Sequence, residues 1–275
     1  MNFHSDEWIM EQVYRHWNEA QKIYPRNRLV GIFLQGSQNY GLDYESSDVD
    51  TKLVVLPSWE DIILNKKPIS TTHILDNDEH LDAKDIRLMF NCFRKQNVNF
   101  LEILFTNYKI LNFPYSSFWN ILIEHNEQIA RYNSVAAVRT MAGMCKEKYH
   151  AMEHPYPSKL EVIEKYGYDP KQLHHLARMY EYIQRYIAGV PYADCLRAVQ
   201  VWRFQEIKTG AYTLEEAREE GKALLKGADD LYQKYKLTHE ETQNKDVDQL
   251  FNLILSEILK LSIQEEWGIR KDYLS

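Results

Sequence analysis

Two short apolar runs near the N-terminus constrain the fold more than any other feature of this chain. Residues 29–34 read LVGIFL and residues 49–56 read VDTKLVVL, and short runs dominated by Val, Leu and Ile are typical of buried strands. Gly36, Ser37 and Gly41 lie between them, so a polar connection of about a dozen residues joins the two runs. The sequence therefore predicts two buried strands of one sheet.

Helical patterns surround these strands. Apolar residues recur at three- and four-residue steps over residues 5–24, which predicts an opening amphipathic helix. A third strand is expected within residues 71–83, bent at residues 76–78, and from Asp85 onwards the spacing is helical. Beyond Tyr115 nearly everything is expected to be helical, with helices at 118–131, 136–152 and 171–187, a capping box from Thr213 to Glu216 and a last helix through 247–261.

These patterns predict the fold class α+β. A small mixed β-sheet with flanking helices is expected in residues 1–112, followed by an all-helical part in residues 113–275. A cleft between the two parts is the natural place for a site.

The charge balance limits the function classes. The chain carries 33 Lys and Arg against 40 Asp and Glu, a net charge of −7, so non-specific coating of nucleic acid is not expected. Residues 131–185 depart from this average, with nine basic against six acidic residues, and an anion site is expected there. No stretch approaches the roughly 20 apolar residues of a membrane span, no secretory signal is visible and the cysteines are widely spaced, so we expect a cytoplasmic protein without a membrane partner.

Asp48 and Asp50 form the first chemical motif, at the start of the second apolar run. Side chains of a strand alternate between faces, so both carboxylates should share one face while Val49 points into the core, with Cα atoms roughly 7 Å apart. Two neighbouring buried carboxylates repel each other unless a divalent cation such as Mg²⁺ neutralises them. Lys52 follows on the same face, where it could balance the acids or contact phosphate. Acids at the start of a strand are also common turn residues, so the pair alone is weak evidence.

Gly36 and Ser37 form the second motif, directly after the first strand. A glycine lets the backbone approach a ligand closely, and the amides that follow can donate to a phosphate oxygen together with the Ser37 hydroxyl. Gly-Ser alone is also weak evidence. The combination is more specific, because an apolar strand, Gly-Ser and a polar connection precede Asp48-Val49-Asp50 at the start of another apolar strand.

In this combination the chain resembles the DNA polymerase β-like nucleotidyltransferases, whose signature is Gly-Ser after one strand and Asp-x-Asp on the next. It is similar in particular to a group of predicted nucleotidyltransferases associated with RNA-repair ligases. The similar runs are residues 36–42, 47–50, 85–87 and 96–104. That group usually has Asn-Pro where this chain has Asn97-Val98. With looser similarity in the helical half, the resemblance covers roughly residues 28–235.

The resemblance implies a nucleotidyltransferase catalytic domain, a helical domain and a metal site that a third carboxylate on a neighbouring strand completes. Asp82 lies in an apolar-acid-apolar pattern and is the preferred third acid. Asp85 is the alternative, but it directly precedes a helical run, where an acid is already explained as an N-terminal cap. With Asp48 and Asp50, Asp82 would hold Mg²⁺ or Mn²⁺ for two-metal catalysis.

The activity implied by the resemblance is transfer of a nucleoside monophosphate from a nucleoside triphosphate to a hydroxyl group, with release of pyrophosphate. Gly36 and Ser37 would hold the departing phosphates. The resemblance favours an RNA 3′-end as the acceptor, with a protein side chain as the second candidate. The alternative from another class is a non-catalytic nucleotide- or RNA-binding module of the same fold.

Three basic side chains of the helical half are candidates for neutralising phosphate charge. Lys171, His175 and Arg178 follow one another at steps of four and three residues, which places them on one helix face. A cationic, solvated helix surface has the same spacing, so the sequence leaves both interpretations open.

Overall fold

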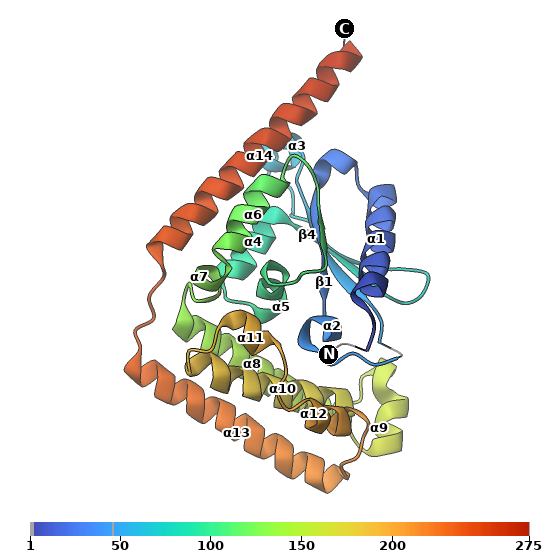
Figure 1. The fold of residues 1–275 in the computed structure, drawn as a ribbon, viewed down its shortest axis with the longest axis vertical. Helices are drawn as coiled ribbons and strands as arrows, with labels where there is room; N and C mark the ends of the chain where they lie inside the picture. Colours follow the sequence, from blue (N-terminus) through green and yellow to red (C-terminus); the bar gives the residue numbers. More distant parts are fainter. Residues whose placement is uncertain (1–2, 46, 275) are drawn as a thin grey trace.

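A computed structural model of the chain describes residues 3–45 and 47–274, with side chains described up to residue 268. A mixed sheet with helices on both faces is followed by a run of helices (Figure 1), which confirms the predicted α+β class. The elements of the first half are α1 (Asp6–Ile23), η1 (Arg26–Arg28), β1 (Leu29–Gln35), α2 (Ser37–Tyr40), β2 (Asp50–Val55), α3 (Trp59–Ile63), β3 (Ser70–Ile74), β4 (His80–Asp85), α4 (Ile86–Arg94), α5 (Val98–Leu101), η2 (Glu102–Leu104) and β5 (Lys109–Leu111). The remaining elements are α6 (Ser116–Glu124), α7 (Asn126–Ala130), α8 (Ser134–Met152), η3 (Pro157–Lys159), α9 (Leu160–Tyr166), α10 (Pro170–Ile187), α11 (Tyr192–Leu196), α12 (Val201–Lys208), α13 (Leu214–Thr238) and α14 (Lys245–Leu274).

Five strands form one sheet in the order β3-β4-β2-β1-β5. β2 runs parallel to β4, and the other neighbouring pairs are antiparallel, so the sheet is mixed. The segment expected to hold one bent strand holds two, because the chain reverses between β3 and β4 in a turn where Asp78 has φ 62°, a conformation that aspartate tolerates. The short strand β5 has no counterpart among the predicted strands.

The two faces of the sheet bury different apolar clusters. Leu53 of β2 belongs to a cluster that contains Val13 of α1, whereas its neighbour Val54 belongs to a larger cluster with the helices of the other face. Side chains at alternate positions share a face, so Asp50 and Lys52 lie on the same face as Val54. The polar end of β2 therefore points toward the helical half.

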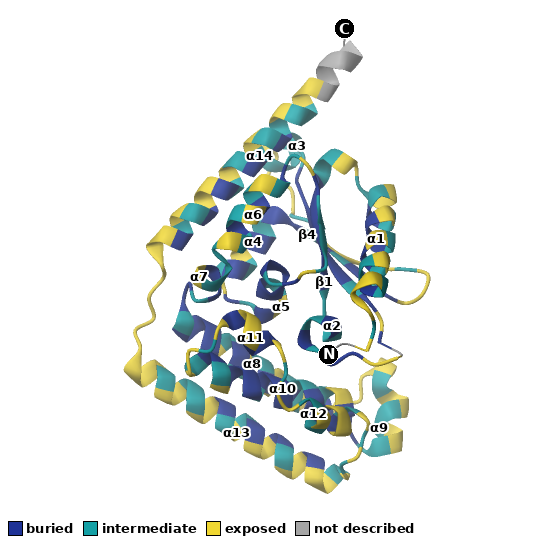
Figure 2. Ribbon diagram, in the orientation of Figure 1, coloured by how far each residue is buried: buried dark blue, intermediate teal, exposed yellow. Residues whose placement is uncertain are grey.

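Helices α8, α10 and α13 pack against one another in the second half of the chain. Figure 2 shows that buried residues dominate α10, whereas α13 has a largely exposed outer side. The predicted capping box is confirmed, because Thr213 accepts a hydrogen bond from the amide of Glu216 and the Glu216 carboxylate accepts one from the amide of Thr213. None of the described helices is both long enough and apolar enough to cross a membrane.

The last helix, α14, returns to the sheet-bearing half and runs along α4 (Figure 1). Phe251 packs against Phe90 and Phe93, and Arg94 donates to Asp248 at 2.8 Å. A single apolar cluster runs through both halves of the molecule. The division of the chain after residue 112 therefore stays a prediction.

We expect Phe251→Ala to lower the free energy of unfolding by about 3–5 kcal/mol, because a fully buried ring loses its contacts with Phe90, Phe93 and Tyr132. Leu253→Ala is the matched control on the same helix. Leu253 is 58% exposed, so its replacement should change stability by less than about 0.5 kcal/mol. Urea unfolding followed by circular dichroism measures both variants, and equal losses would contradict docking of α14 through Phe251.

Candidate functional site

A cavity of about 330 Å³ lies between the sheet and the helices of the second half. Five of the residues predicted from the sequence line it, namely Gly36, Asp50, Lys52, His175 and Arg178. Four others lie outside this lining, namely Ser37, Asp48, Asp82 and Lys171. The structure thus brings parts of the two sequence motifs and part of the predicted basic helix face to one space. A larger cavity of about 630 Å³ contains none of the predicted residues.

The turn after β1 lets the backbone line the cavity at Gly36. This residue has φ 101°, which favours glycine, and apart from its chain neighbours no described residue has an atom within 4 Å of the position that a Cβ would take. The Gly36 carbonyl accepts a hydrogen bond from the Asn39 amide at 3.0 Å. Ser37 follows as the first residue of α2, and its hydroxyl lies 3.4 Å from Oε1 of Gln38. The turn therefore presents glycine backbone, rather than the serine side chain, to the cavity.

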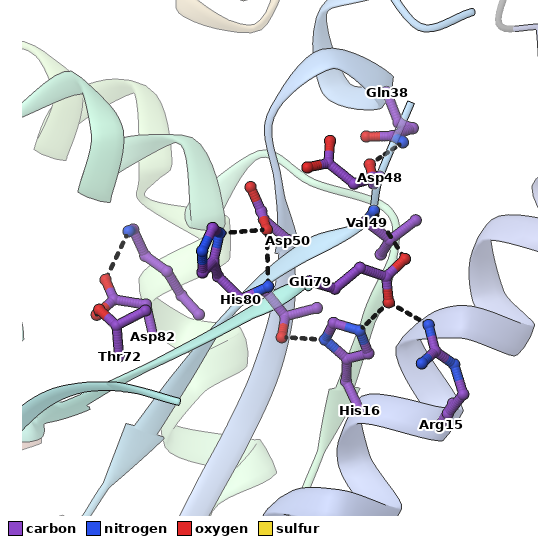
Figure 3. Close-up of polar contacts among 12 residues, drawn as sticks. Arg15, His16, Gln38, Asp48, Val49, Asp50, Thr72, Glu79, His80 and Asp82 are labelled. Atoms are coloured by element: carbon purple, nitrogen blue, oxygen red, sulfur yellow. Dashed lines mark hydrogen bonds and ion pairs between the residues drawn. The ribbon is translucent and has the colours of Figure 1, made fainter. Parts of the chain in front are cut away.

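Asp48, two residues before β2, and Asp50, the first residue of β2, point to the same side of the chain, opposite to Val49 (Figure 3). Val49 is fully buried, as the alternation of the strand predicts. The backbone N–H of His80 donates to Oδ1 of Asp50 at 2.9 Å, and its ring Nδ1 lies 3.2 Å from the same oxygen. Burial and the negative charge of Asp48 raise the pKa of Asp50, although the His80 hydrogen bonds lower it. The two carboxylates are therefore close enough to repel each other.

A buried network behind the strand fixes the peptide between these acids. Glu79 accepts the amide of Val49 at 3.1 Å, and its other oxygen lies 2.8 Å from Nε2 of His16 (Figure 3). The opposite ring nitrogen of His16 lies 2.8 Å from the hydroxyl of Thr51. Helix α1 therefore holds β2 at the point where Asp48 and Asp50 emerge.

Asp82 lies opposite Lys52 in the parallel pair of strands, and both side chains share a face. Its carboxylate pairs with Lys52 at 3.1 Å and with Lys84 at 3.0 Å, and it accepts the hydroxyl of Thr72 at 3.2 Å. Burial alone would raise the pKa of Asp82, but the two lysines outweigh burial and lower it. The structure therefore pairs Asp82 with cations rather than with Asp48 and Asp50.

Asp85 is the N-cap of α4, as the alternative interpretation of this acid predicts. It is 1% exposed, accepts the amide of Arg87 at 2.9 Å and binds the Arg87 guanidinium with both oxygens, at 2.9 and 2.7 Å. Both carboxylate oxygens are therefore used within the fold.

The donor set for a metal ion consists of two acids in this arrangement. Within residues 3–45 and 47–268, no group of three His, Cys, Asp or Glu side chains is placed to hold a metal ion. Asp48 and Asp50 still fit a divalent cation, because oxygen ligands suit Mg²⁺ and a cation would relieve the repulsion that raises the pKa of Asp50. Asp82 as the third ligand stays a prediction.

Arg178 of α10 brings a buried positive charge to the cavity. It is 7% exposed, its guanidinium lies 3.8 Å from the centre of the Tyr40 ring, and its Nε and Nη1 atoms have no hydrogen-bond partner among the described residues. A buried cation with unused donors is costly unless an anion binds it. Arg178 therefore supports the interpretation of this helix face as part of an anion-binding site.

The other two basic candidates on α10 behave differently. Burial and the neighbouring His174 and Arg178 lower the pKa of His175 well below its usual range, so its ring is neutral at pH 7 and adds no charge to the cavity. Lys171 is exposed outside the cavity lining. Burial, together with the charge of Lys171, lowers the pKa of the nearby Lys208 to about 8. The three candidates are therefore not one cationic row.

Several residues that line the cavity were not predicted from the sequence. Tyr40, Asn99, Glu102 and Lys148 line the cavity without having been predicted. Glu102 is 2% exposed, and burial raises its pKa to about 7. The sequence does contain a signal for Glu102, because this acid lies inside the apolar run of residues 100–104 and a buried acid is rare unless it is paired. Lys148 carried no comparable signal, since a lysine on a helix is ordinarily solvated.

Comparisons with known proteins find a weak structural similarity. No protein-family model and no curated protein matches the chain. Among solved structures, it is similar to a nucleotidyltransferase-like protein from Exiguobacterium sibiricum 255-15, with 14% identity, coverage of 82% of this chain and 75% of that chain, and a TM-score of 0.33. A similarity with this TM-score does not indicate a function. The functional proposal below rests on the residues of the cavity.

We expect Arg178→Ala to weaken binding of inorganic triphosphate about tenfold to hundredfold, because hydrogen bonds to charged groups contribute about 1.5–3 kcal/mol. Lys171→Ala on the same helix is the matched control. An exposed charge outside the cavity is screened by salt, so this variant should change affinity by less than about threefold. Titration calorimetry at low and high salt measures both, and equal effects would contradict the assignment of Arg178.

Proposed function

We propose that this chain is a metal-dependent nucleotidyltransferase that moves a nucleoside monophosphate from a nucleoside triphosphate to a hydroxyl group and releases pyrophosphate. The observation that carries the proposal is one cavity lined by the Gly36 turn, Asp50, Lys52 and Arg178, whose Nε and Nη1 atoms have no hydrogen-bond partner among the described residues. The order of these residues along the chain, with Gly-Ser before Asp-x-Asp, is the order on which the family resemblance rests. Charge and sequence motif therefore favour the same chemistry.

The residues of the cavity would contribute to polyphosphate binding in different ways. Lys52, Lys148 and Arg178 supply positive charge, and the free donors of Arg178 suit phosphate oxygens. Gly36 allows a phosphate to approach the backbone without a side chain in the way. Fixed cations stabilise charge that develops on a leaving group without reorganising during the reaction. Mg²⁺ or Mn²⁺ held by Asp48 and Asp50 would neutralise phosphate charge and polarise the phosphoryl group.

The proposed acceptor rests on the resemblance to the nucleotidyltransferases associated with RNA-repair ligases. An RNA 3′-end is the favoured acceptor, and the hydroxyl group of a protein side chain is the second. Both present a hydroxyl to the same phosphoryl group, so the chemistry of the nucleotide site is common to them. The acceptor arms of the assay below distinguish them.

One observation favours a second candidate, a non-catalytic nucleotide- or RNA-binding module. Asp82 is paired with Lys52 and Lys84, so the third acid of a two-metal site is engaged in ion pairs. A module of this kind would bind nucleotide through Arg178 and Lys52 and transfer nothing. Catalysis through Asp82 requires this carboxylate to leave both lysines.

Incubation with each α-labelled nucleoside triphosphate and Mg²⁺ or Mn²⁺ tests the activity, with RNA and protein acceptors in parallel. We expect label on one acceptor class, and no label with the double variant Asp48→Ala/Asp50→Ala, because removing both carboxylates removes the ligands for the metal. Nucleotide binding without transfer to any acceptor, unchanged in the double variant, would favour the binding module.

The pair Asp82→Ala and Asp85→Ala tests the third acid in the same assay. We expect Asp82→Ala to abolish transfer. Asp85→Ala should keep transfer and lower stability by up to about 3–5 kcal/mol, because it removes both the N-cap of α4 and the buried carboxylate that binds Arg87. Thermal unfolding serves as the folding control. Loss of transfer in Asp85→Ala alone, with both variants folded, would show that the assignment of Asp82 is wrong.

A further inference from the structure

Glu102 is a buried acid at the wall of the cavity, and none of the roles proposed above uses it. It is 2% exposed and begins η2, the turn that follows α5. Its carboxylate accepts hydrogen bonds from the hydroxyl of Tyr40 and from the backbone amide of Gly36. One side chain therefore contacts both ends of the segment that carries the Gly-Ser motif.

Tyr40 extends this connection to the helical half. Its ring lies under the Arg178 guanidinium at 3.8 Å, and its carbonyl accepts the amide of Ala198 at 3.1 Å, in the linker between α11 and α12. Tyr40 and Glu102 also line the larger cavity of about 630 Å³, so together they form a wall between the two cavities. The position of Arg178 over its ring therefore depends on where Glu102 holds Tyr40.

We propose that Glu102 is the positioning residue for polyphosphate binding in this cavity, holding the Gly36 turn directly and the Arg178 guanidinium through the ring of Tyr40. This inference rests on the proposed function. A group that is already oriented before the ligand arrives loses less freedom on binding, so affinity depends on the residue that orients it. The long side chain of Arg178 has unused donors and gains most from such support.

The charge of Glu102 gives the proposal a second readout. The groups that face it are Tyr40 of α2, Lys52 of β2, Arg178 of α10, the Gly36 amide and Tyr192 of α11, and Asp50, Lys148 and His175 line the same cavity. Burial raises the pKa of Glu102 to about 7, and the Tyr40 hydrogen bond, Lys52 and Arg178 oppose this rise. Above pH 7 the carboxylate is negative and opposes a polyanion, and below pH 7 it is neutral. Affinity for a polyphosphate should therefore rise as pH falls through about 7.

The experiment uses inorganic triphosphate in the presence of EDTA, so that neither a metal nor an acceptor is needed, and calorimetry of the full chain at pH 6 and pH 8. Glu102→Gln and Glu102→Ala both lack the charge, but only glutamine can still accept the Gly36 amide. We expect Glu102→Ala to bind about tenfold or more weaker than Glu102→Gln at both pH values, the size of loss seen when a supporting partner is removed. Titration of the ligand itself affects all variants equally. The wild type should therefore show a larger gain on acidification than Glu102→Gln.

Tyr40→Phe keeps the ring under Arg178 and removes only the hydroxyl. The lost hydrogen bond should move the midpoint of the pH dependence to higher pH, because this bond lowers the pKa of Glu102. A purely structural role would move the unfolding temperature but not this midpoint. Thermal unfolding of every variant is the control, and Tyr40→Phe carries the test if Glu102→Ala does not fold.

Three outcomes are decisive. Equal affinities of folded Glu102→Ala and Glu102→Gln, or a wild-type pH profile that matches Glu102→Gln, would overturn the role of Glu102 while leaving the proposed function intact. A wild-type protein that binds no triphosphate would instead overturn the phosphate-binding cavity, and the role of Glu102 with it.

Discussion

Glu79 is one ionised group that joins helix α1 to the segment before β2, and the position of the two motif acids depends on it. Arg15 and His16 of α1 contact one carboxylate oxygen, and the amide of Val49 donates to the other. Burial alone would raise the pKa of Glu79, but hydrogen bonds from His16, Asn77, Val49 and Arg15 outweigh burial and lower it to about 2. Because His80 follows directly and binds Asp50, the turn before β4 holds both the backbone and a side chain of the Asp-x-Asp segment.

Lys52 occupies the other critical position, between the acids of the sheet and the cavity. It is 4% exposed, pairs with Asp82, and lies 4.4 Å from the centre of the Phe100 ring. Its charge also lowers the pKa of Glu102. Under the proposed function, a phosphate that contacts Lys52 would compete with Asp82 for the same ammonium group. Such competition would weaken the ion pair of Asp82 with Lys52, while the ion pair of Asp82 with Lys84 would remain.

The predictable part of the molecule was the part with a local pattern. The strands of residues 29–34 and 49–56, the opening helix and the capping box at Thr213 follow from apolar spacing and end signals, and all are found. The division of the segment 71–83 into two strands was missed, because the reversal depends on Asp78 adopting a positive φ. The pairing of β2 with β4, which sets Lys52 opposite Asp82, depends on contacts across about 30 residues of sequence, and no local pattern reports it.

The amino-acid order by itself determined the alternation of Asp48, Val49 and Asp50, the backbone freedom at Gly36 and the helix face shared by His175 and Arg178, because each follows from the geometry of a single element. Only the tertiary structure decided which charges meet. It paired Asp82 with lysines, left Nε and Nη1 of Arg178 without a hydrogen-bond partner among the described residues, and placed Glu102 against Tyr40 and Gly36. The physical reason is that burial and charge pairing depend on distances between elements far apart in the chain, and these distances exist only once the elements have packed.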